Sequence, residues 1–498
     1  MKNNIILFKL ALMLTLISCS DDFLVKTDPT NLVEDNFYQT ETHIEQAVNG
    51  VYSQLQGIIS NQWQYNEFIT DNTTLHFNIP NRGQGPALEA IEYWNINAST
   101  GNINNLYNSI YQAMVNINTT LGHLQDATFD ETAVQKFESE LKFLRAYYYF
   151  HLVQYFGDVI IITEPVDSPS SAWTFERQPI EDVYALIESD LKDAVSGAHD
   201  YDAPAGRVTK GAALSLLGKV YLTKKEYDDA IQTLDQVLLM DYELLMSYAD
   251  VFDPQNKNHK ESIFDVQFQG GNELGEHSNF IYTFAPRESV GAVIDFSGEN
   301  GGGWNIPTLD IIDLYEVDDL RKEVSLNEGY TSLDDEWVPV PYITKYHHKH
   351  SERGQTDDNW PVLRYADVLL MLAEAINEEL GPTVDAYDYL NQVRTRAGLD
   401  DLNNLNQDTF RDAVLQERRI ELAFENHRWF DLKRTNTPEE LAQFLNAYGE
   451  TARSNPTTPR GSIPFGVSDY VFQPHEALFP IPANQILINN ELTQNPGY

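Results

Sequence analysis

Apolar residues recur at helical spacing over most of the chain, which predicts a mainly α protein. The segments with this pattern are residues 41–56, 104–124, 132–156, 180–195, 209–223, 227–239, 365–379, 383–396 and 409–433. Two long regions, 58–101 and 241–361, interrupt it. A region as long as the second must carry its own structure or serve a function. We therefore expect a helical scaffold from residues 41–57, 102–240 and 362–498, joined to loop-rich segments.

Two of the expected helices have the spacing of a tetratricopeptide repeat, in which a small residue lets antiparallel helices approach and aromatic side chains fill the wedge between them. The residues at these positions are Leu217, Gly218, Tyr221, Tyr227, Ala230 and Leu234. Ala373, Ile376, Ala386 and Leu390 repeat the pattern in part, and Ala146 and Tyr149 repeat its first helix. The pattern predicts a stack of helical hairpins, with generic hairpins as the alternative.

The segment 408–434 differs from the other expected helices because its apolar residues lie all round the helical wheel. We expect one long helix, capped by Asp408, that packs on more than one side. The charged residues between the apolar positions are Glu417, Arg418, Arg419, Glu421, Glu425 and Arg428. Charges close to a core must pair with one another or with backbone, so we expect a structural brace and no catalyst here.

Composition narrows the function classes. The 498 residues include 75 Asp and Glu against 33 Lys and Arg, a formal net charge of -42. A surface this acidic repels nucleic acid, so we exclude a nucleic-acid-binding protein. This net charge also disfavours a polyanionic ligand, although a local pocket of basic residues can make the potential positive at one place on the surface.

The single cysteine, Cys19, defines the expected compartment. It follows an apolar run that is too short to span a bilayer and is typical of a signal peptide, here residues 1–18. Leu16 to Cys19 fit a bacterial lipobox, which predicts acylation of the Cys19 thiol and attachment to a membrane by lipid alone. An ordinary signal peptide with an incidental cysteine is the alternative. Residues 19–40 are expected to be a tether, followed by one domain over 41–498.

Several segments resemble one known family. ERRIELAFENHRWFDLKR (417–434) is similar to the C-terminal signature of the SusD/RagB outer-membrane lipoproteins. Four further segments agree with it in order: ELKFLRAYYYFHLVQYFGDV (140–159), RVTKGAALSLLGKVYL (207–222), RYADVLLMLAEAINE (364–378) with LNQVRTRAGL (390–399), and LFPIPANQILINNELTQNPGY (478–498). The resemblance implies a tetratricopeptide-like scaffold, a variable ligand face formed by residues 58–101 and 241–361, and a SusC-like TonB-dependent transporter as partner. It also implies an outer-membrane location, and Ser20, Asp21 and Asp22 resemble an export signal to the cell surface.

The same two loop-rich regions carry five of the seven tryptophans, among Asn, Asp, Gly and Tyr. A sugar offers a flat apolar face and a rim of hydroxyls, which suit an aromatic ring with amides or carboxylates beside it. The predicted ligand-binding residues are Trp63, Tyr65, Asp71, Trp94, Asn97, Trp304, Asn305, Trp337 and Trp360. Packing within the loops is the alternative for each tryptophan. Trp94 and Asn97 also fall where family members place a stacking aromatic and an amide.

The sequence gives little support for a metal site or a catalytic site. His475 and Glu476 begin an HExxH pattern, but Phe479 occupies the position of the second metal ligand. The segment 346–350, YHHKH, is interpreted as a solvated strand end or loop, not a metal site. We expect no catalytic residues and no cofactor, and the sequence leaves open whether Ca²⁺ braces the loops. The predicted function is capture of an oligosaccharide at the cell surface, with a peptide cargo or a surface glycoside hydrolase as alternatives.

Overall fold

The computed structural model describes residues 37–83, 85–166, 168–200, 204–271 and 275–498. The predicted signal peptide, Cys19 and most of the predicted tether lie outside this part of the chain. Within it, no helix combines the length and the apolar character that crossing a bilayer requires.

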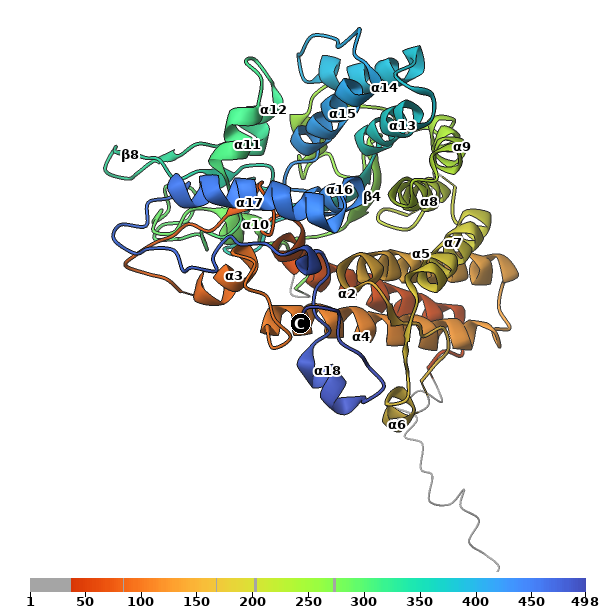
Figure 1. The fold of residues 1–498 in the computed structure, drawn as a ribbon. Coiled ribbons are helices and arrows are strands. Elements are labelled where there is room, and N and C mark those ends of the chain that lie inside the picture. Colours follow the sequence, from red (N-terminus) through yellow and green to blue (C-terminus); the bar gives the residue numbers. More distant parts are fainter. Residues whose placement is uncertain (1–36, 84, 167, 201–203, 272–274) are drawn as a thin grey trace, which may run out of the picture.

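The predicted mainly α architecture is confirmed (Figure 1). The helices that form the scaffold are α2 (Glu41–Asn66), α4 (Gly101–Leu124), α5 (Glu131–Phe156), α7 (Ile180–Gly197), α8 (Lys210–Lys224), α9 (Tyr227–Leu238), α13 (Tyr365–Leu380), α14 (Val384–Arg396) and α15 (Gln407–Glu421). Most match the predicted segments except in their terminal turns. Helix α2 continues past the predicted end at residue 56, so Trp63 and Tyr65 are helical and not part of a loop.

Successive scaffold helices pack on one another: α4 on α5, α5 on α7, α7 on α8, α8 on α9, and α13 on both α9 and α14. The contact between α8 and α9 depends on Gly218, since a Cβ at this position would collide with the side chain of Leu234. Ala230 and Leu234 are fully buried in the same contact. Ala373, Ala386 and Leu390 are buried together between α13 and α14. The close approach expected of a repeat is therefore present at the residues that predicted it.

The predicted single helix over 409–433 is wrong. Helix α15 ends at Glu421, and α16 (Arg428–Thr435) begins after a turn in which Phe424 and Asn426 adopt positive φ angles of 65° and 71°. Left-handed residues end a helix even where the side chains favour it. The predicted cap is also wrong, because Asn406 caps α15 through its side chain and Thr409 completes the capping box.

The charged residues of α15 and the following turn form the expected brace, but most of their partners come from other elements. Glu421 lies between three guanidinium groups, accepting from Arg364 at 2.8 Å, Arg396 at 2.6 Å and Arg321 at 3.2 Å. Glu425 pairs with Arg364 at 2.7 Å. All of these residues are buried. We refer to Arg321, Arg364, Arg396, Glu421 and Glu425 as the buried ionic network.

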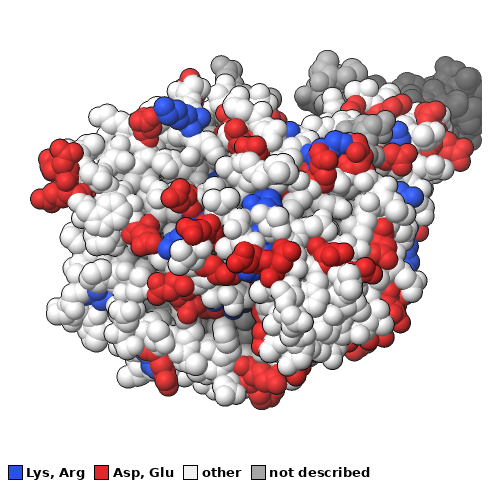
Figure 2. Space-filling view, turned by 90° about the horizontal axis from the view of Figure 1, so that it is seen from above, with Lys and Arg blue, Asp and Glu red and all other residues white. Residues whose placement is uncertain are grey.

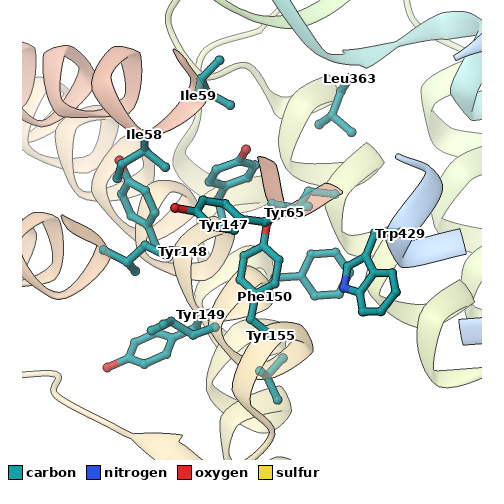
Figure 3. Close-up of a cluster of buried hydrophobic side chains, with 14 of the residues drawn as sticks. Ile58, Ile59, Tyr65, Tyr147, Tyr148, Tyr149, Phe150, Tyr155, Leu363 and Trp429 are labelled. Atoms are coloured by element: carbon teal, nitrogen blue, oxygen red, sulfur yellow. The ribbon is translucent and has the colours of Figure 1, made fainter. Parts of the chain in front are cut away.

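Aromatic side chains of α5 fill the core where the scaffold meets α16 (Figure 3). Tyr155 stacks on Phe479 with ring centroids 5.4 Å apart, and Trp429 also stacks on Phe479, with centroids 6.4 Å apart. The tyrosines of α5 are almost fully buried, as is Trp429. This core explains why the run AYYYF in α5 shows no amphipathic pattern.

Most of the remaining elements are short, the exception being α17 with 17 residues, and many of them lie on the side of the molecule with α3, α10, α11 and β8 in Figure 1. The helices are α3 (Gly85–Glu92), α6 (Pro169–Ala172), α10 (Phe280–Phe284), α11 (Leu309–Leu314), α12 (Arg321–Ser325), α17 (Pro438–Ser454), α18 (Ala483–Ile488), η2 (Ala249–Val251) and η3 (Pro474–Ala477). The strands are β1 (Thr73–Thr74), β2 (Val159–Ile160), β3 (Arg177–Gln178), β4 (Ser262–Val266), β5 (Ile306–Pro307), β6 (Leu326–Asn327), β7 (Tyr330–Thr331), β8 (Trp337–Val338), β9 (Tyr342–Ile343) and β10 (Trp360–Arg364).

The strands form two-stranded antiparallel sheets, among them β1 with β5 and β10 with β4. Strand β4 lies in the second loop-rich region, and residues 298–305 of the same region form neither helix nor strand before β5 begins. The β1–β5 pairing joins the two predicted loop-rich regions, since Thr73 lies opposite Pro307.

Candidate ligand-binding face

Four loop segments meet beyond the β1–β5 pairing, and we call them the loop face: residues 75–83, 285–288, 301–305 and 455–465. Backbone bonds tie them together. The His76 N–H donates to Gly303 O at 2.8 Å, and the Gly303 N–H donates to Ala285 O at 2.8 Å. The Phe77 N–H donates to Thr458 Oγ1 at 3.0 Å. The loop face therefore combines both predicted variable regions with a C-terminal segment that the sequence had assigned to the scaffold.

Two predicted ligand residues, Trp304 and Asn305, belong to the loop face, and of these only Trp304 is partly exposed. Its side chain is partly buried against the core, and its indole Nε1 is itself buried, with no hydrogen-bond partner in the part of the chain that the structure describes. The guanidinium carbon of Arg287 lies 6.0 Å from the ring centroid. An indole with one supported side and a neighbouring guanidinium suits the apolar face and the polar rim of a sugar.

Arg287 joins three of the loop segments. Its Nε donates to Gly302 O at 2.7 Å, and its Nη1 donates to Asn81 O at 2.8 Å. Its backbone N–H donates to His76 Nδ1 at 3.2 Å. Neutral carbonyl oxygens thus orient the guanidinium, and no carboxylate pairs with it among the described residues.

Two further arginines stack on aromatic rings of the loop face. The guanidinium carbon of Arg82 lies 3.6 Å from the Phe77 ring centroid, and that of Arg460 lies 3.9 Å from the same centroid. Arg460 is also 3.9 Å from the Phe465 centroid. Arg460 donates to the Tyr93 hydroxyl at 2.6 Å, and Arg82 forms an ion pair with Glu89. Each flat guanidinium face covers an aromatic face, which leaves N–H groups at the guanidinium edges.

Trp337 and Asn97 are exposed, but they lie apart from the centre of the loop face. Trp337 is 60% exposed on the β7–β8 hairpin, which Figure 1 shows projecting from the body. Asn97 precedes α4, and its side-chain oxygen accepts from the Ser99 N–H at 2.9 Å. Neither residue is brought next to Trp304.

Three of the predicted stacking tryptophans are buried, and the prediction that their indoles are exposed is wrong. Trp63, Trp94 and Trp360 are 2%, 2% and 1% exposed. The Trp94 indole donates to Ile69 O at 2.9 Å and packs edge-on against Phe472. These rings satisfy the core, so in this conformation they offer no surface to a sugar.

Three of the polar residues predicted beside the tryptophans, Tyr65, Asp71 and Asn305, are also buried, and they have structural partners. Asp71 pairs with Arg428 through both carboxylate oxygens at 2.8 Å. Burial alone would raise the pKa of Asp71, but Arg419 and Arg428 outweigh burial and lower it to about 2. The Tyr65 hydroxyl donates to Asn102 O at 2.8 Å, and Asn305 accepts from Thr73 at 2.6 Å. The sequence showed that these polar side chains lie near tryptophans in the chain. It could not show whether their hydrogen bonds are made inside the protein or are available to a ligand.

Burial and neighbouring charge set the protonation of the loop face. Burial and the charge of Arg287 lower the pKa of His76 to about 4, so this side chain is neutral at pH 7. Burial raises the pKa of Glu92 to about 7, although its Oε1 accepts from Thr74, Leu75 and Tyr470. Burial and Arg82 lower the pKa of Arg287, while Glu288 acts in the opposite sense.

The sequence analysis missed Arg82, Arg287 and Arg460 because they are far apart in the chain. A signal was present: each follows a proline by one or two residues, in PNR (80–82), APR (285–287) and TPR (458–460). Proline-rich segments favour exposed turns, and an arginine held in such a turn is a candidate ligand contact.

The His-rich segment 346–350 makes hydrogen bonds to neighbouring groups. His347 Nε2 lies 2.8 Å from Val293 O, and His350 Nε2 lies 2.7 Å from the Tyr282 hydroxyl. Across the described ranges, no group of three or more His, Cys, Asp and Glu side chains is arranged to hold a metal ion. The histidines of this segment therefore serve as hydrogen-bonding partners.

Comparison with known proteins places this fold. A model described as the SusD family matches residues 336–498, and one described as "Starch-binding associating with outer membrane" matches residues 22–222. SusD-like protein P2 of Formosa agariphila is 26% identical over 98% of each chain, and SusD-like protein P25 of the same organism is 27% identical over 99% of each chain.

Solved structures agree. A laminarin-binding SusD-like protein superposes with a TM-score of 0.73 at 26% identity, covering 93% of this chain and 100% of its own. A SusD homologue from Bacteroides thetaiotaomicron superposes with a TM-score of 0.78 over 95% of this chain and all of its own, and at 22% identity it shows the fold alone. The glycan-binding proteins of this family are non-catalytic. Both family models match, and relatives found by sequence and by structure align with nearly the whole chain. The chain therefore belongs to the SusD/RagB family.

Proposed function

We propose that this protein captures oligosaccharides at the cell surface and passes them to a SusC-like TonB-dependent transporter. The observation that carries the proposal is Trp304, a half-buried indole on the loop face with Arg287 beside it. This pairing supplies an apolar platform and edge donors, which together suit a sugar ring. The laminarin-binding relative and the family description as starch-binding add support.

The proposed location rests on the lipobox-like motif at Cys19 and on the family description. The family description includes association with the outer membrane. We propose that lipid on Cys19 holds the protein there, facing the cell exterior, and that residues 19–40 act as the tether of one domain over 41–498. A tether of this length would let the protein move over the mouth of the transporter.

Within the proposed site, Trp304 is the central platform and Trp337 is an outer one on the projecting β7–β8 hairpin (Figure 1). The buried residues of the prediction support the fold and do not touch the ligand in this proposal; they are Trp63, Tyr65, Asp71, Trp94, Asn305 and Trp360. Asn97 is exposed near α4, and it would contact only a ligand long enough to leave the loop face.

Calorimetry of the full chain in detergent tests the site against soluble laminarin, starch oligosaccharides and a mixed peptide library. The Trp304→Ala variant is expected to bind the preferred glycan about 10- to 100-fold more weakly, equivalent to about 1–3 kcal/mol for a lost aromatic face. Trp173→Ala is the matched control, since Trp173 is 53% exposed and directly follows α6, which Figure 1 shows well away from α3, α11 and β8. Equal loss in both variants, or binding of peptides alone, would overturn the assignment.

The partner is tested separately by purifying the tagged lipoprotein from native outer membranes. A TonB-dependent transporter is expected to co-purify in stoichiometric amount. Recovery of the lipoprotein alone under mild detergent, with the acyl group intact, would count against the partner.

A further inference from the structure

The arginines of this protein have two kinds of surroundings. Most of the arginines in the described ranges pair with at least one carboxylate, as expected where acids outnumber bases by 75 to 33. Figure 2 shows how widely Asp and Glu are spread over one face of the molecule. Arg287 and Arg460 are exceptions on the loop face, since neither is within ion-pair distance of a carboxylate in the described part of the chain.

Arg287 and Arg460 both lie close to Arg82 and the residue that follows it. Arg82 and Arg460 lie against the same ring of Phe77, at 3.6 and 3.9 Å from its centroid. Gly83, the residue after Arg82, lies directly against the guanidinium of Arg287, and a Cβ there would collide with it. Guanidinium groups from three loops therefore converge on the segment 77–83.

Few negative charges balance this cluster. Glu89 pairs with Arg82, and exposed Glu288 adjoins Arg287 in the chain. Glu92 lies underneath with its pKa raised to about 7 by burial, so its charge is only partly present at neutral pH. His76 is neutral.

The pKa values of the arginines differ in the same sense. Burial and the charge of Arg82 lower the pKa of Arg287. At Arg364 and Arg434 the paired carboxylates outweigh burial and raise the pKa. The loop face is thus a small positive area on a strongly negative protein.

We propose that the loop face binds an acidic glycan, whose carboxylate or sulfate groups are received by Arg82, Arg287 and Arg460 while a sugar ring lies on Trp304. The proposal rests on the proposed function and names its substrate class. Arginine suits this role because its planar edge donates two parallel hydrogen bonds to one carboxylate or sulfate. Stacking on Phe77 and Phe465 holds these planes in fixed orientations, so little side-chain freedom is lost on binding.

The net charge of -42 does not contradict this ligand. At physiological ionic strength the Debye length is about 8 Å, so the average charge of the protein acts weakly on a group already in contact. The nearest charges then decide the interaction, and on the loop face these are guanidinium groups. The negative surface around them would restrict a polyanion to this one area.

The test compares acidic polysaccharides with neutral counterparts of the same backbone, using calorimetry on the full chain in detergent. The uronate arm uses oligogalacturonate against carboxyl-reduced oligogalacturonate, and the sulfate arm uses dextran sulfate against dextran. We expect the acidic member of at least one arm to bind about tenfold or more tightly than its neutral partner, the scale of one charged hydrogen-bonding contact. The arm that responds identifies the anionic group.

Variants then connect this preference to the arginines. Arg460→Gln is expected to weaken binding of the acidic probe about tenfold or more while changing binding of the neutral probe less than about threefold. Arg287→Gln is expected to weaken binding of the acidic probe by a similar factor and to weaken binding of the neutral probe by less, since Arg287 also lies beside Trp304. Arg411→Gln is the control, because Arg411 lies on α15 in an exposed pair with Asp408 and a further pair with Glu378. Unfolding transitions of all variants are recorded alongside.

A gain of affinity guards against misreading a folding defect. Glu288→Gln removes the exposed carboxylate next to Arg287, and we expect it to tighten binding of the acidic probe severalfold, which a misfolded variant cannot do. Failure of every acidic probe to bind overturns this inference, as does acidic binding that is indifferent to all of these substitutions. If neutral glycans bind through Trp304 in either case, the proposed function stands without it.

Discussion

The buried ionic network and the loop face use the same side chain, arginine, in opposite ways. In the network, Arg364 is 1% exposed and donates to Glu261, Glu421 and Glu425 at 2.7–2.9 Å. On the loop face, Arg287 and Arg460 contact carbonyl oxygens, a hydroxyl group and aromatic rings. The first set has its charge neutralised internally, and the second has not.

The difference separates residues that hold the fold from residues that can hold a ligand. A charged group whose hydrogen bonds are all made within the protein has nothing left to offer a ligand, however prominent it is in the sequence. The tryptophans follow the same division, since Trp94 is committed to the core and Trp304 keeps part of its ring outside it. The comparison predicts that substitutions in the two regions change different measured quantities.

The largest effect is expected from Glu421→Gln in the buried network. Burial alone would raise the pKa of Glu421, but Arg396, Arg364 and Arg321 outweigh it and hold the pKa well below its usual range. Removing the charge leaves these guanidinium groups undercompensated in the interior, which should lower the free energy of unfolding by about 3–5 kcal/mol in urea denaturation at pH 7.

Glu138→Gln serves as its control, because Glu138 forms a partly exposed i,i+4 pair with Lys142 and should cost less than about 1 kcal/mol. Ligand affinity of folded Glu421→Gln is expected to match that of the unaltered protein. A loss of affinity with unchanged stability would contradict the division between the two regions.

Trp94→Ala sharpens the division, because sequence and structure assign this residue differently. Removing a fully buried indole that bonds Ile69 should lower the free energy of unfolding by about 3–5 kcal/mol. Trp304→Ala should lower it by much less and instead weaken binding. Should Trp94→Ala keep full stability but lose the ligand, the indole would be a contact residue after all, reached through a rearranged loop.

The smallest effect concerns Glu92, a carboxyl group beneath the loop face. Its folded pKa of about 7 lies above its usual value of 4.5, so the folded state binds the proton more tightly. The stability it contributes is complete below about pH 4.5 and is lost as pH rises toward and through 7. Glu92→Gln keeps the oxygen that accepts from Thr74, Leu75 and Tyr470 and removes the titration.

The unaltered protein should therefore lose about 1–3 kcal/mol more than Glu92→Gln between pH 5 and pH 8. Urea denaturation at a series of pH values measures this difference. Parallel pH profiles for the two proteins would show that Glu92 is already ionised in the folded state.

The sequence allowed the scaffold to be predicted well because local spacing determines it. Gly218 and Leu234 are sixteen positions apart in one hairpin, and their contact could be inferred from the repeat pattern alone. The break between α15 and α16 could not, since it depends on left-handed conformations at Phe424 and Asn426, residues that do not require them. Tertiary contacts of the surrounding charges outweighed local helix preference there.

The candidate site was predicted only in part for a similar reason. The aromatic richness of residues 58–101 and 241–361 correctly indicated where the loops converge, and Trp304 was among the residues chosen. Exposure, however, depends on what packs against each ring, and Phe472 and Tyr470, which cover Trp94, are almost four hundred residues away in the chain. The arginines of the loop face come together across similar separations.

The hydrogen bonds that Arg428 and Arg419 make to Asp71 and Asn72 affect the entropy cost of ligand binding. Arg428 holds Asp71, and Arg419 donates to Asn72 at 2.8 Å, just before β1 leads into the loop face. These bonds form when the protein folds, so the backbone under Trp304 and Phe77 is already ordered before any ligand arrives. Binding would then require little loss of conformational entropy from the protein, and a modest number of contacts would be enough for capture.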